Sequence, residues 1–139
     1  MWQKKNAFDL QWTMNPQHKL TWKQTDRLQG VEEKYSLIIS NPPYIKVSES
    51  GQTVHRQVSR YEPSTALYLP DKDYELWFEE FFEQVSTHLT PRGEFLMEGH
   101  ENELQSLAKR WSKSFPKDNI RVMQDLTGRD RVLWVQKQG

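Results

Sequence analysis

Residues 35–44 read Tyr-Ser-Leu-Ile-Ile-Ser-Asn-Pro-Pro-Tyr, an apolar run that stops at an asparagine and two prolines. Apolar β-branched runs between turn residues are typical of strands covered on both faces in a parallel sheet. Proline has no backbone donor, so Pro42 and Pro43 end the predicted strand Tyr35–Ser40. Ligands of open α/β sheets bind beyond the carboxyl ends of strands, which makes Asn41–Tyr44 a candidate site. A simpler interpretation, that these residues only terminate the strand, stays open.

The rest of the chain alternates between helical and extended patterns. Apolar residues recur every three or four positions from Tyr74 to Leu89, which predicts an amphipathic helix of about four turns, stopped by Pro91-Arg92-Gly93. A second helix is predicted over 104–115, and strands over 19–24, 94–98, 120–123 and 132–135. The connection Thr127–Asp130 contains a glycine and suits a hairpin, so the last strand runs antiparallel to its neighbour. Together these elements predict an α/β fold.

Composition predicts a small single-domain protein. The chain has 139 residues and a mass of 16.7 kDa, and its 19 basic residues balance its 19 acidic ones. A net charge of zero argues against direct nucleic-acid binding and against attraction to anionic membranes. Cysteine is absent and no apolar run is long enough to cross a membrane, so we expect a cytoplasmic protein. The 4 histidines have no metal-ligand spacing, so we expect surface histidines and no metal site.

The residues after the strand suit one kind of chemistry. A carboxamide nitrogen is a poor nucleophile because its lone pair is delocalised. The side-chain oxygen of Asn41 and the carbonyl oxygen of Pro42 can accept hydrogen bonds from both N–H groups and favour the charge that develops during attack on a methyl sulfonium. Pro43 stiffens the loop, and the ring of Tyr44 can pack on a planar substrate or on the cationic donor.

Asn41-Pro42-Pro43-Tyr44 resembles the signature of methyltransferases that modify amino groups with S-adenosylmethionine. Three further segments resemble the HemK-like family, which methylates the glutamine of peptide chain release factors at N5. They are Tyr61–Leu67, Leu89–Glu98 and Asp125–Val132. The order and spacing agree with the C-terminal part of that family, so the resemblance implies a Rossmann-like class I methyltransferase sheet.

The resemblance also implies roles for individual residues. Asn41, Pro42 and Tyr44 would be catalytic, and Pro43 and Glu62 would bind the substrate together with them. Asp26 would contact the adenine amino group of S-adenosylmethionine, and Asn41 would lie between this donor and the glutamine. The implied partner is a peptide chain release factor.

One expected feature of the family has no counterpart in the sequence. The family's sheet begins with a strand, a glycine-rich turn and a helix that hold the donor. The 6 glycines here lie at Gly30 or later and form no Gly-x-Gly cluster. We therefore expect a truncated catalytic domain over 1–139 that lacks the donor-binding βαβ half, with an arm or remnant helix at 1–18 and a substrate loop at 41–72. Its donor pocket would be incomplete.

The missing half would leave the strand Tyr35–Ser40 with an open edge. Such edges pair readily with other chains, so we expect a homodimer or pairing through this edge. In the alternative, residues 20–24 pair with this open edge in place of the missing strand.

Two other functions stay open. The chain could be a non-catalytic remnant or interaction module that keeps the motif without the pocket. It could also be a nucleic-acid amino-methyltransferase, which the zero net charge disfavours. Glu98 follows a predicted strand and is a further candidate to line the pocket, although carboxylates at strand ends are more often solvated.

Overall fold

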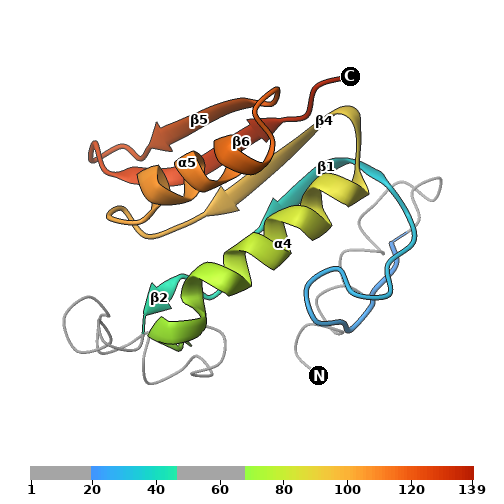
Figure 1. The fold of residues 1–139 in the computed structure, drawn as a ribbon, viewed down its shortest axis with the longest axis horizontal. Helices are drawn as coiled ribbons and strands as arrows, with labels where there is room; N and C mark the ends of the chain where they lie inside the picture. Colours follow the sequence, from blue (N-terminus) through green and yellow to red (C-terminus); the bar gives the residue numbers. More distant parts are fainter. Residues whose placement is uncertain (1–19, 47–67) are drawn as a thin grey trace. The chain divides into compact units, whose positions relative to one another are not determined.

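The computed structural model describes residues 20–46 and 68–139. The chain forms two units, residues 1–30 and 31–139. The second unit holds all the helices and strands of the described residues (Figure 1). The predictions for residues 1–18, for Tyr61–Leu67 and for Glu62 lie outside the described residues.

Four strands form the main sheet, in the order β1-β4-β6-β5. They are β1 (Tyr35–Ser40), β4 (Leu89–Glu98), β5 (Asn119–Gln124) and β6 (Asp130–Gln136). β1 is parallel to β4, whereas β6 is antiparallel to both β4 and β5. The α/β class and the antiparallel C-terminal hairpin are therefore confirmed. Within the predicted substrate loop, β2 (Ile45–Lys46) pairs in parallel with β3 (Tyr68–Leu69) as a separate sheet.

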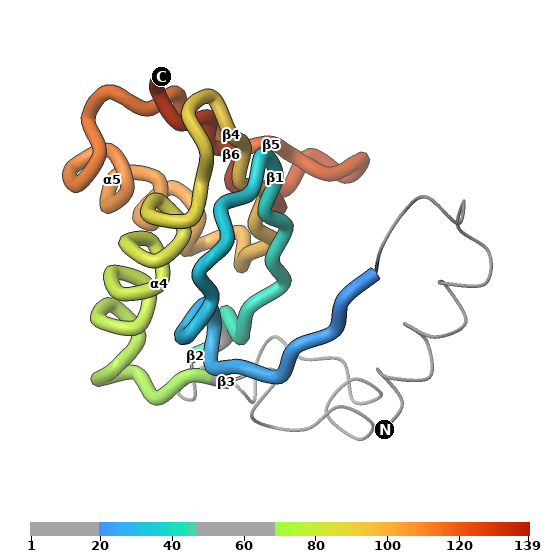
Figure 2. Tube along the Cα trace, turned by 90° about the vertical axis from the view of Figure 1, so that its right-hand side faces the viewer, coloured from blue at the N-terminus to red at the C-terminus, as the bar shows by residue number. Residues whose placement is uncertain are grey.

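Two helices pack on one face of the main sheet (Figure 2). The first, α4 (Tyr74–His88), follows a short 3-10 turn, η2 (Asp71–Asp73). It lies between β1 and β4 in the chain and supplies the crossover that a parallel strand pair requires. The second, α5 (Leu104–Ser114), lies between β4 and β5. Both helices were predicted from the spacing of their apolar residues, and both are confirmed.

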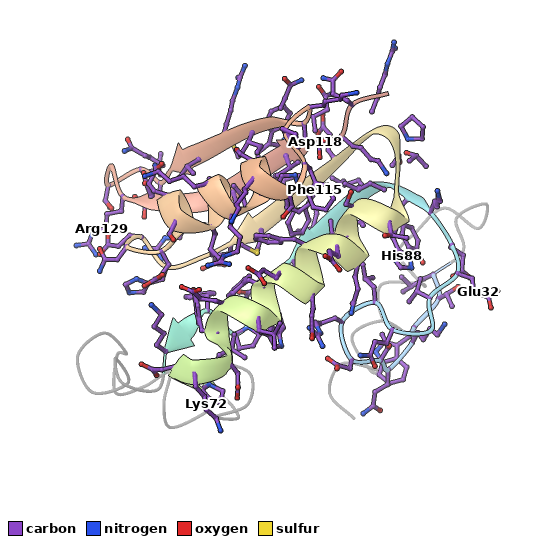
Figure 3. The ribbon with its side chains drawn as sticks, viewed as in Figure 1. Glu32, Lys72, His88, Phe115, Asp118 and Arg129 are labelled. Carbon is purple, nitrogen blue, oxygen red and sulfur yellow. The ribbon has the colours of Figure 1, made fainter. Side chains whose placement is uncertain are left out.

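Aromatic rings fill the layer between the helices and the sheet. The ring centroid of Phe82 in α4 lies 4.9 Å from that of Trp111 in α5 and 6.4 Å from that of Phe95 in β4. All three side chains are buried, and the rings of Trp111 and Phe95 stack at 5.5 Å. Trp111 Nε1 donates a hydrogen bond to Asp118 at 3.0 Å, and Phe115 packs on Trp111 where α5 ends (Figure 3). This cluster fixes both helices against β4.

The helix α4 ends earlier than predicted. It ends at His88, and Leu89 already pairs with Tyr35 of β1. Pro91-Arg92-Gly93 therefore does not stop the helix but forms an irregular step in β4, where the register jumps from Leu89 to Glu94. A Cβ on Gly93 would lie 2.9 Å from the carbonyl oxygen of Thr90, so this close approach requires glycine.

The burial of β1 also differs from the prediction. It was expected to be covered on both faces, but Leu37 is 49% exposed and Ile39 is 72% exposed. The helices lie on the opposite face, where Phe95 is the register partner of Ile38. β1 is also the last strand in the order of the main sheet. The expected open edge at Tyr35–Ser40 is thus present in the described part of the chain.

The strand predicted over 19–24 is wrong. Residues 20–24 carry no regular secondary structure, and Trp22 is 39% exposed. The turn that follows is closed by a hydrogen bond from Gln29 N to Asp26 O at 3.0 Å. An alternating sequence becomes a strand only where a partner satisfies its backbone groups, and these residues have no ladder. The alternative in which residues 20–24 complete the sheet is therefore also wrong.

The turn between β5 and β6 is built around the carboxylate of Asp125. Its Oδ1 atom accepts hydrogen bonds from Thr127 Oγ1 at 2.7 Å, from Thr127 N at 2.8 Å and from Arg129 N at 3.2 Å. The guanidinium of Arg131 approaches Oδ2 at 3.4 Å. These donors favour the ionised form, with the Thr127 hydroxyl contributing most, and lower the pKa of Asp125 to about 2.

We predict that Asp125 makes the free energy of unfolding depend on pH in a narrow acidic range. Because its pKa is lowered in the folded state, its contribution to stability is present above its ordinary value of 3.8 and is lost as pH falls through about 2. The Asp125→Asn variant should lose less free energy of unfolding between pH 4 and pH 2 than the unmodified protein. Urea unfolding across this range measures the difference. Asp73→Asn, an exposed residue without a capping hydrogen bond, is the control and should keep the original pH dependence.

Candidate active site

The Asn41–Tyr44 motif lies at the carboxyl end of the parallel strand pair. It follows the last residue of β1, and Ser40 is in register with Met97 of β4. The carboxyl ends of parallel strands meet at the same sheet edge, so Glu98 at the end of β4 lies beside the motif. Asn41 is exposed and Pro42 is buried, which anchors the loop through a proline and leaves the asparagine carboxamide open to a ligand.

Tyr44 connects the motif to β4. Its hydroxyl donates a hydrogen bond to Glu98 Oε1 at 3.2 Å, and both side chains are half-buried. The hydrogen bond joins two side chains that are 54 positions apart and holds the tyrosine ring beside the end of β4. Glu98, which the sequence suggested as a pocket residue, is brought to the motif.

Lys46 holds the other end of the motif loop. Its Nζ atom lies 2.7 Å from Glu103 Oε1 and 4.9 Å from the ring centroid of Tyr74. The Tyr74 hydroxyl in turn lies 3.5 Å from the carbonyl oxygen of Tyr44. The segment after β1 is thus tied to β4, to α4 and to the residue that precedes α5. This restraint fixes the backbone on which Asn41 and Pro42 are presented.

Sequence reasoning missed Lys46, Tyr74 and Glu103. Lys46 and Glu103 are 57 positions apart, and no local pattern marks them as partners. Tyr74 was counted as one apolar residue of a helix, whereas its hydroxyl reaches the motif loop. Only one feature of the sequence could have pointed to these residues, namely that Lys46 lies two positions after the motif.

The prediction of surface histidines is wrong for His100. It is only 8% exposed, and it lies between β4 and α5 in the chain. The backbone N–H of Asn102 donates to His100 Nδ1 at 3.3 Å, and the N–H of Leu104 donates to the His100 carbonyl oxygen at 3.1 Å. A Cβ on Gly99 would lie 2.5 Å from Leu104 Cδ2, so a larger residue there would have to displace the buried Leu104 side chain.

The remaining predicted residues are not joined to this cluster by the structure. Asp26 lies in the first unit, is exposed, and forms an ion pair with the neighbouring Arg27 at 3.2 Å. Glu62 lies outside the described residues. Their roles in binding the donor and the substrate stay predictions.

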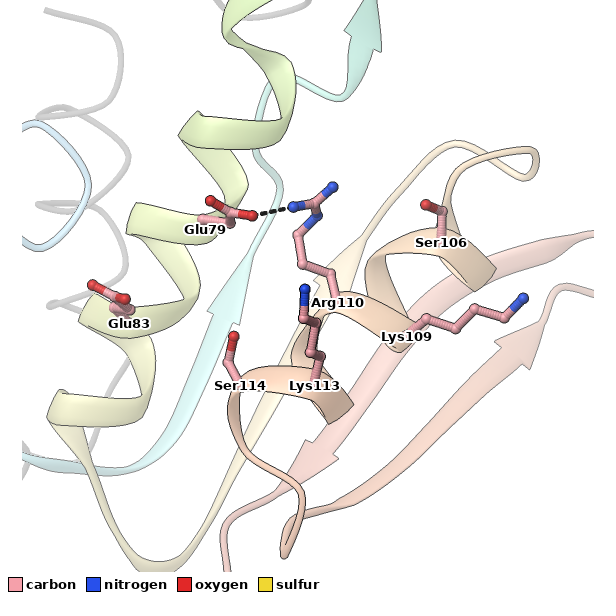
Figure 4. Close-up of a pocket in the computed structure, with 7 residues that line it drawn as sticks. All are labelled: Glu79, Glu83, Ser106, Lys109, Arg110, Lys113 and Ser114. Carbon is pink, nitrogen blue, oxygen red and sulfur yellow. Dashed lines mark hydrogen bonds and ion pairs between the residues drawn. The ribbon is translucent and has the colours of Figure 1, made fainter.

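A groove of about 530 Å³ lies between α4 and α5 (Figure 4). Acidic Glu79 and Glu83 line it from α4, and the basic residues Lys109, Arg110 and Lys113 line it from α5. Arg110 bridges the helices through ion pairs with Glu75, at 2.9 Å, and with Glu79. No residue of the motif lines this groove, so it is separate from the candidate active site.

Neither a metal-binding cluster nor a membrane-spanning helix lies within residues 20–46 and 68–139. No group of three or more potential metal-ligating side chains occurs there. None of the helices in these ranges is long and apolar enough to cross a membrane.

The sequence was compared with known proteins. No protein-family model matches the chain. The release factor glutamine methyltransferase of Lactococcus lactis is 28% identical over 120 residues, which cover 86% of this chain and 44% of that protein. The one from Enterococcus faecalis is 32% identical over 100 residues, covering 72% of this chain and 35% of the relative. The chain resembles release factor glutamine methyltransferases over most of its length. The resemblance inferred from the motifs is therefore confirmed, although the chain spans less than half the length of these relatives.

Among solved structures, a methyltransferase from Pyrococcus furiosus is similar with a TM-score of 0.48 and 18% sequence identity. The match covers 78% of this chain and 44% of that one.

We predict that Tyr44 and Glu98 stabilise the protein as a pair. Their hydrogen bond is half-buried, so a double-mutant cycle with Tyr44→Phe and Glu98→Ala should give a coupling free energy of about 1 kcal/mol. Urea unfolding of the four proteins measures this coupling. Glu94→Ala is the matched control, because Glu94 lies on the same face of β4 but four residues before the motif edge. Additive effects of Tyr44→Phe and Glu98→Ala would contradict the prediction.

Proposed function

We propose that this chain carries the substrate side of an S-adenosylmethionine-dependent methyltransferase that modifies N5 of a glutamine in peptide chain release factors. One observation supports it most directly. The exposed carboxamide of Asn41 stands on a loop held at the carboxyl end of β1 by the Tyr44–Glu98 and Lys46–Glu103 contacts. The relatives named above carry the same activity in their names. The place of action is then the cytoplasm, where release factors work.

In this proposal Asn41 and Pro42 act on the substrate carboxamide. The Asn41 side-chain oxygen and the Pro42 carbonyl oxygen accept one N–H each and orient the nitrogen for attack. The nitrogen loses its delocalisation as the N–C bond forms, and its N–H groups become more positive. Both acceptors then bind more strongly than in the ground state, which lowers the barrier. The methyl–sulfur bond breaks as the nitrogen–methyl bond forms, and the extra proton leaves to water.

S-adenosylmethionine supplies an electrophilic methyl group when it is bound. Asn41 and Asp26 both expose oxygen acceptors, and this chemistry suits the donor's amino groups. The sequence has no Gly-x-Gly turn to approach the donor closely, so we infer that the donor binds weakly to this chain by itself.

We predict that Asn41→Ala abolishes most of the methyl transfer. Loss of one preorganised hydrogen-bonding group in a transition state typically lowers kcat on the order of 100-fold. The assay combines the chain, a release factor and donor labelled in its methyl group, both alone and with a separately produced donor-binding half of the Lactococcus lactis relative. Mass spectrometry then locates the label on a glutamine. Asn119→Ala, an exposed asparagine at the start of β5, is the control and should retain full activity.

The same assay separates the competing functions. Release-factor binding without methylation in either mixture would favour the interaction module over the enzyme. Methylation of adenine or cytosine, but not of the release factor, would favour the nucleic-acid enzyme. Unchanged activity of Asn41→Ala would contradict the assigned role of the motif.

We also propose that the chain forms a homodimer through the open edge of β1. Leu37 and Ile39 are 49% and 72% exposed on this strand, and β1 has only β4 as a partner in the described sheet. Unpaired edges of apolar strands pair with other strands, and a lysine there opposes such pairing.

We predict that Ile39→Lys converts this dimer to a monomer. Sedimentation velocity of the unmodified protein and of the variant measures the change. Leu76→Lys, which places the same charge on an exposed residue of α4, should leave the dimer intact. A monomeric unmodified protein would contradict the proposal.

A further inference from the structure

The β5–β6 turn lies at the same sheet edge as the Asn41–Tyr44 motif. β6 is antiparallel to β4, and Glu98 at the end of β4 is in register with Val132 near the start of β6. Gln124 at the end of β5 pairs with Asp130. The intervening residues 125–129 therefore project beyond the edge where β1 and β4 end, as the hairpin in Figure 1 and the label of Arg129 in Figure 3 indicate.

This turn presents a leucine entirely to solvent. The exposed fraction of Leu126 is 108%, the highest of the large apolar residues in the described ranges. The turn that carries it is closed by hydrogen bonds from Asp125 N to Arg129 O, at 2.9 Å, and from Gly128 N to Asp125 O, at 3.0 Å. The Asp125 carboxylate adds the bonds to Thr127 and Arg129 described above. Because the backbone of the turn is already ordered, a partner that binds over Leu126 loses little affinity to the ordering of this backbone.

Neighbouring residues extend this surface. Met123, near the end of β5, is 39% exposed. The Arg129 side chain is 63% exposed and lies 3.6 Å from Glu101, a distance at which an exposed ion pair contributes little. We call Met123, Leu126 and Arg129 the tip surface. It offers an apolar contact with a positive charge at its border.

The tip surface lies within reach of a protein bound at the motif. Neighbouring strands are about 4.8 Å apart, so β5, three strands from β1, is about 14 Å away across the sheet. A standard protein interface buries about 800 Å² on each partner, which corresponds to a disc of about 16 Å radius. A folded protein whose glutamine reaches Asn41 would therefore extend over the tip, whereas a short peptide would not.

We propose that the tip surface docks the protein substrate and that Leu126 is its main contact. The complementary surface would be an apolar depression bordered by a carboxylate that faces Arg129. This inference rests on the proposed function, since it assumes that the partner is a release factor. It adds a recognition surface outside the motif.

The test compares binding of a whole release factor with binding of a short peptide that contains only its glutamine loop. Isothermal titration with the full chain should give a Kd for the whole protein that is on the order of tenfold higher for Leu126→Ser. The peptide's Kd should be unchanged, since it does not reach the tip. Leu76→Ser is the matched control, because Leu76 is 57% exposed on α4, and it should bind both ligands normally. Circular dichroism and the unfolding midpoint check that Leu126→Ser remains folded.

Several outcomes would overturn this proposal. Normal binding of the whole release factor by Leu126→Ser overturns it and leaves the proposed function intact. Equal weakening of peptide and protein would show that the variant damages the motif region instead. If Arg129→Gln weakens binding and Leu126→Ser does not, the contact is a general electrostatic one, as a nucleic acid would make. If the unmodified chain binds neither ligand, the proposed function fails together with the docking surface.

Discussion

The parallel pairing of β1 with β4 is the constraint on which the rest of the structure depends. It requires a crossover, which α4 supplies, and it brings the carboxyl ends of both strands to one edge. Asn41–Tyr44 leaves that edge from β1, and Glu98 reaches it from β4. An antiparallel pairing of the same two strands would place Glu98 at the far end of the sheet. The hydrogen bond between Tyr44 and Glu98 is therefore a direct consequence of topology.

Phe95 supports the pairing of β1 with β4 from the face of the sheet that the helices cover. It contacts Phe82 of α4 and Trp111 of α5, so both helices are packed against the central strand β4 through one ring. The helices in turn position Tyr74 and Glu103, which hold the motif loop through its backbone and through Lys46. Core packing and site geometry are thus mechanically linked.

The sequence predicted the elements well and their environment less well. Tyr35–Ser40 was bounded correctly because a β-branched run ends at two prolines. α4 was recognised because its apolar spacing is regular, although it ends at His88, before the predicted stop. The exposure of Leu37 and Ile39 was missed, since apolar character indicates a strand but not how many of its faces are covered. Tyr44 and Glu98 are 54 positions apart, and such pairs depend on the packed fold. The failed strand at 20–24 shows that alternation without a ladder partner does not specify a strand.

The rigidity of the motif bears on how a substrate would be selected. Two hydrogen-bond acceptors on a stiff loop recognise a carboxamide, and every exposed glutamine carries one. In the proposed function, Asn41 and Pro42 would therefore favour the reaction but would not distinguish one protein from another. Discrimination needs contacts farther from the reacting nitrogen, with groups that only the correct partner satisfies. The ordered hairpin at the same edge has an exposed leucine and a bordering arginine, and it meets that physical requirement without changing the acceptor geometry.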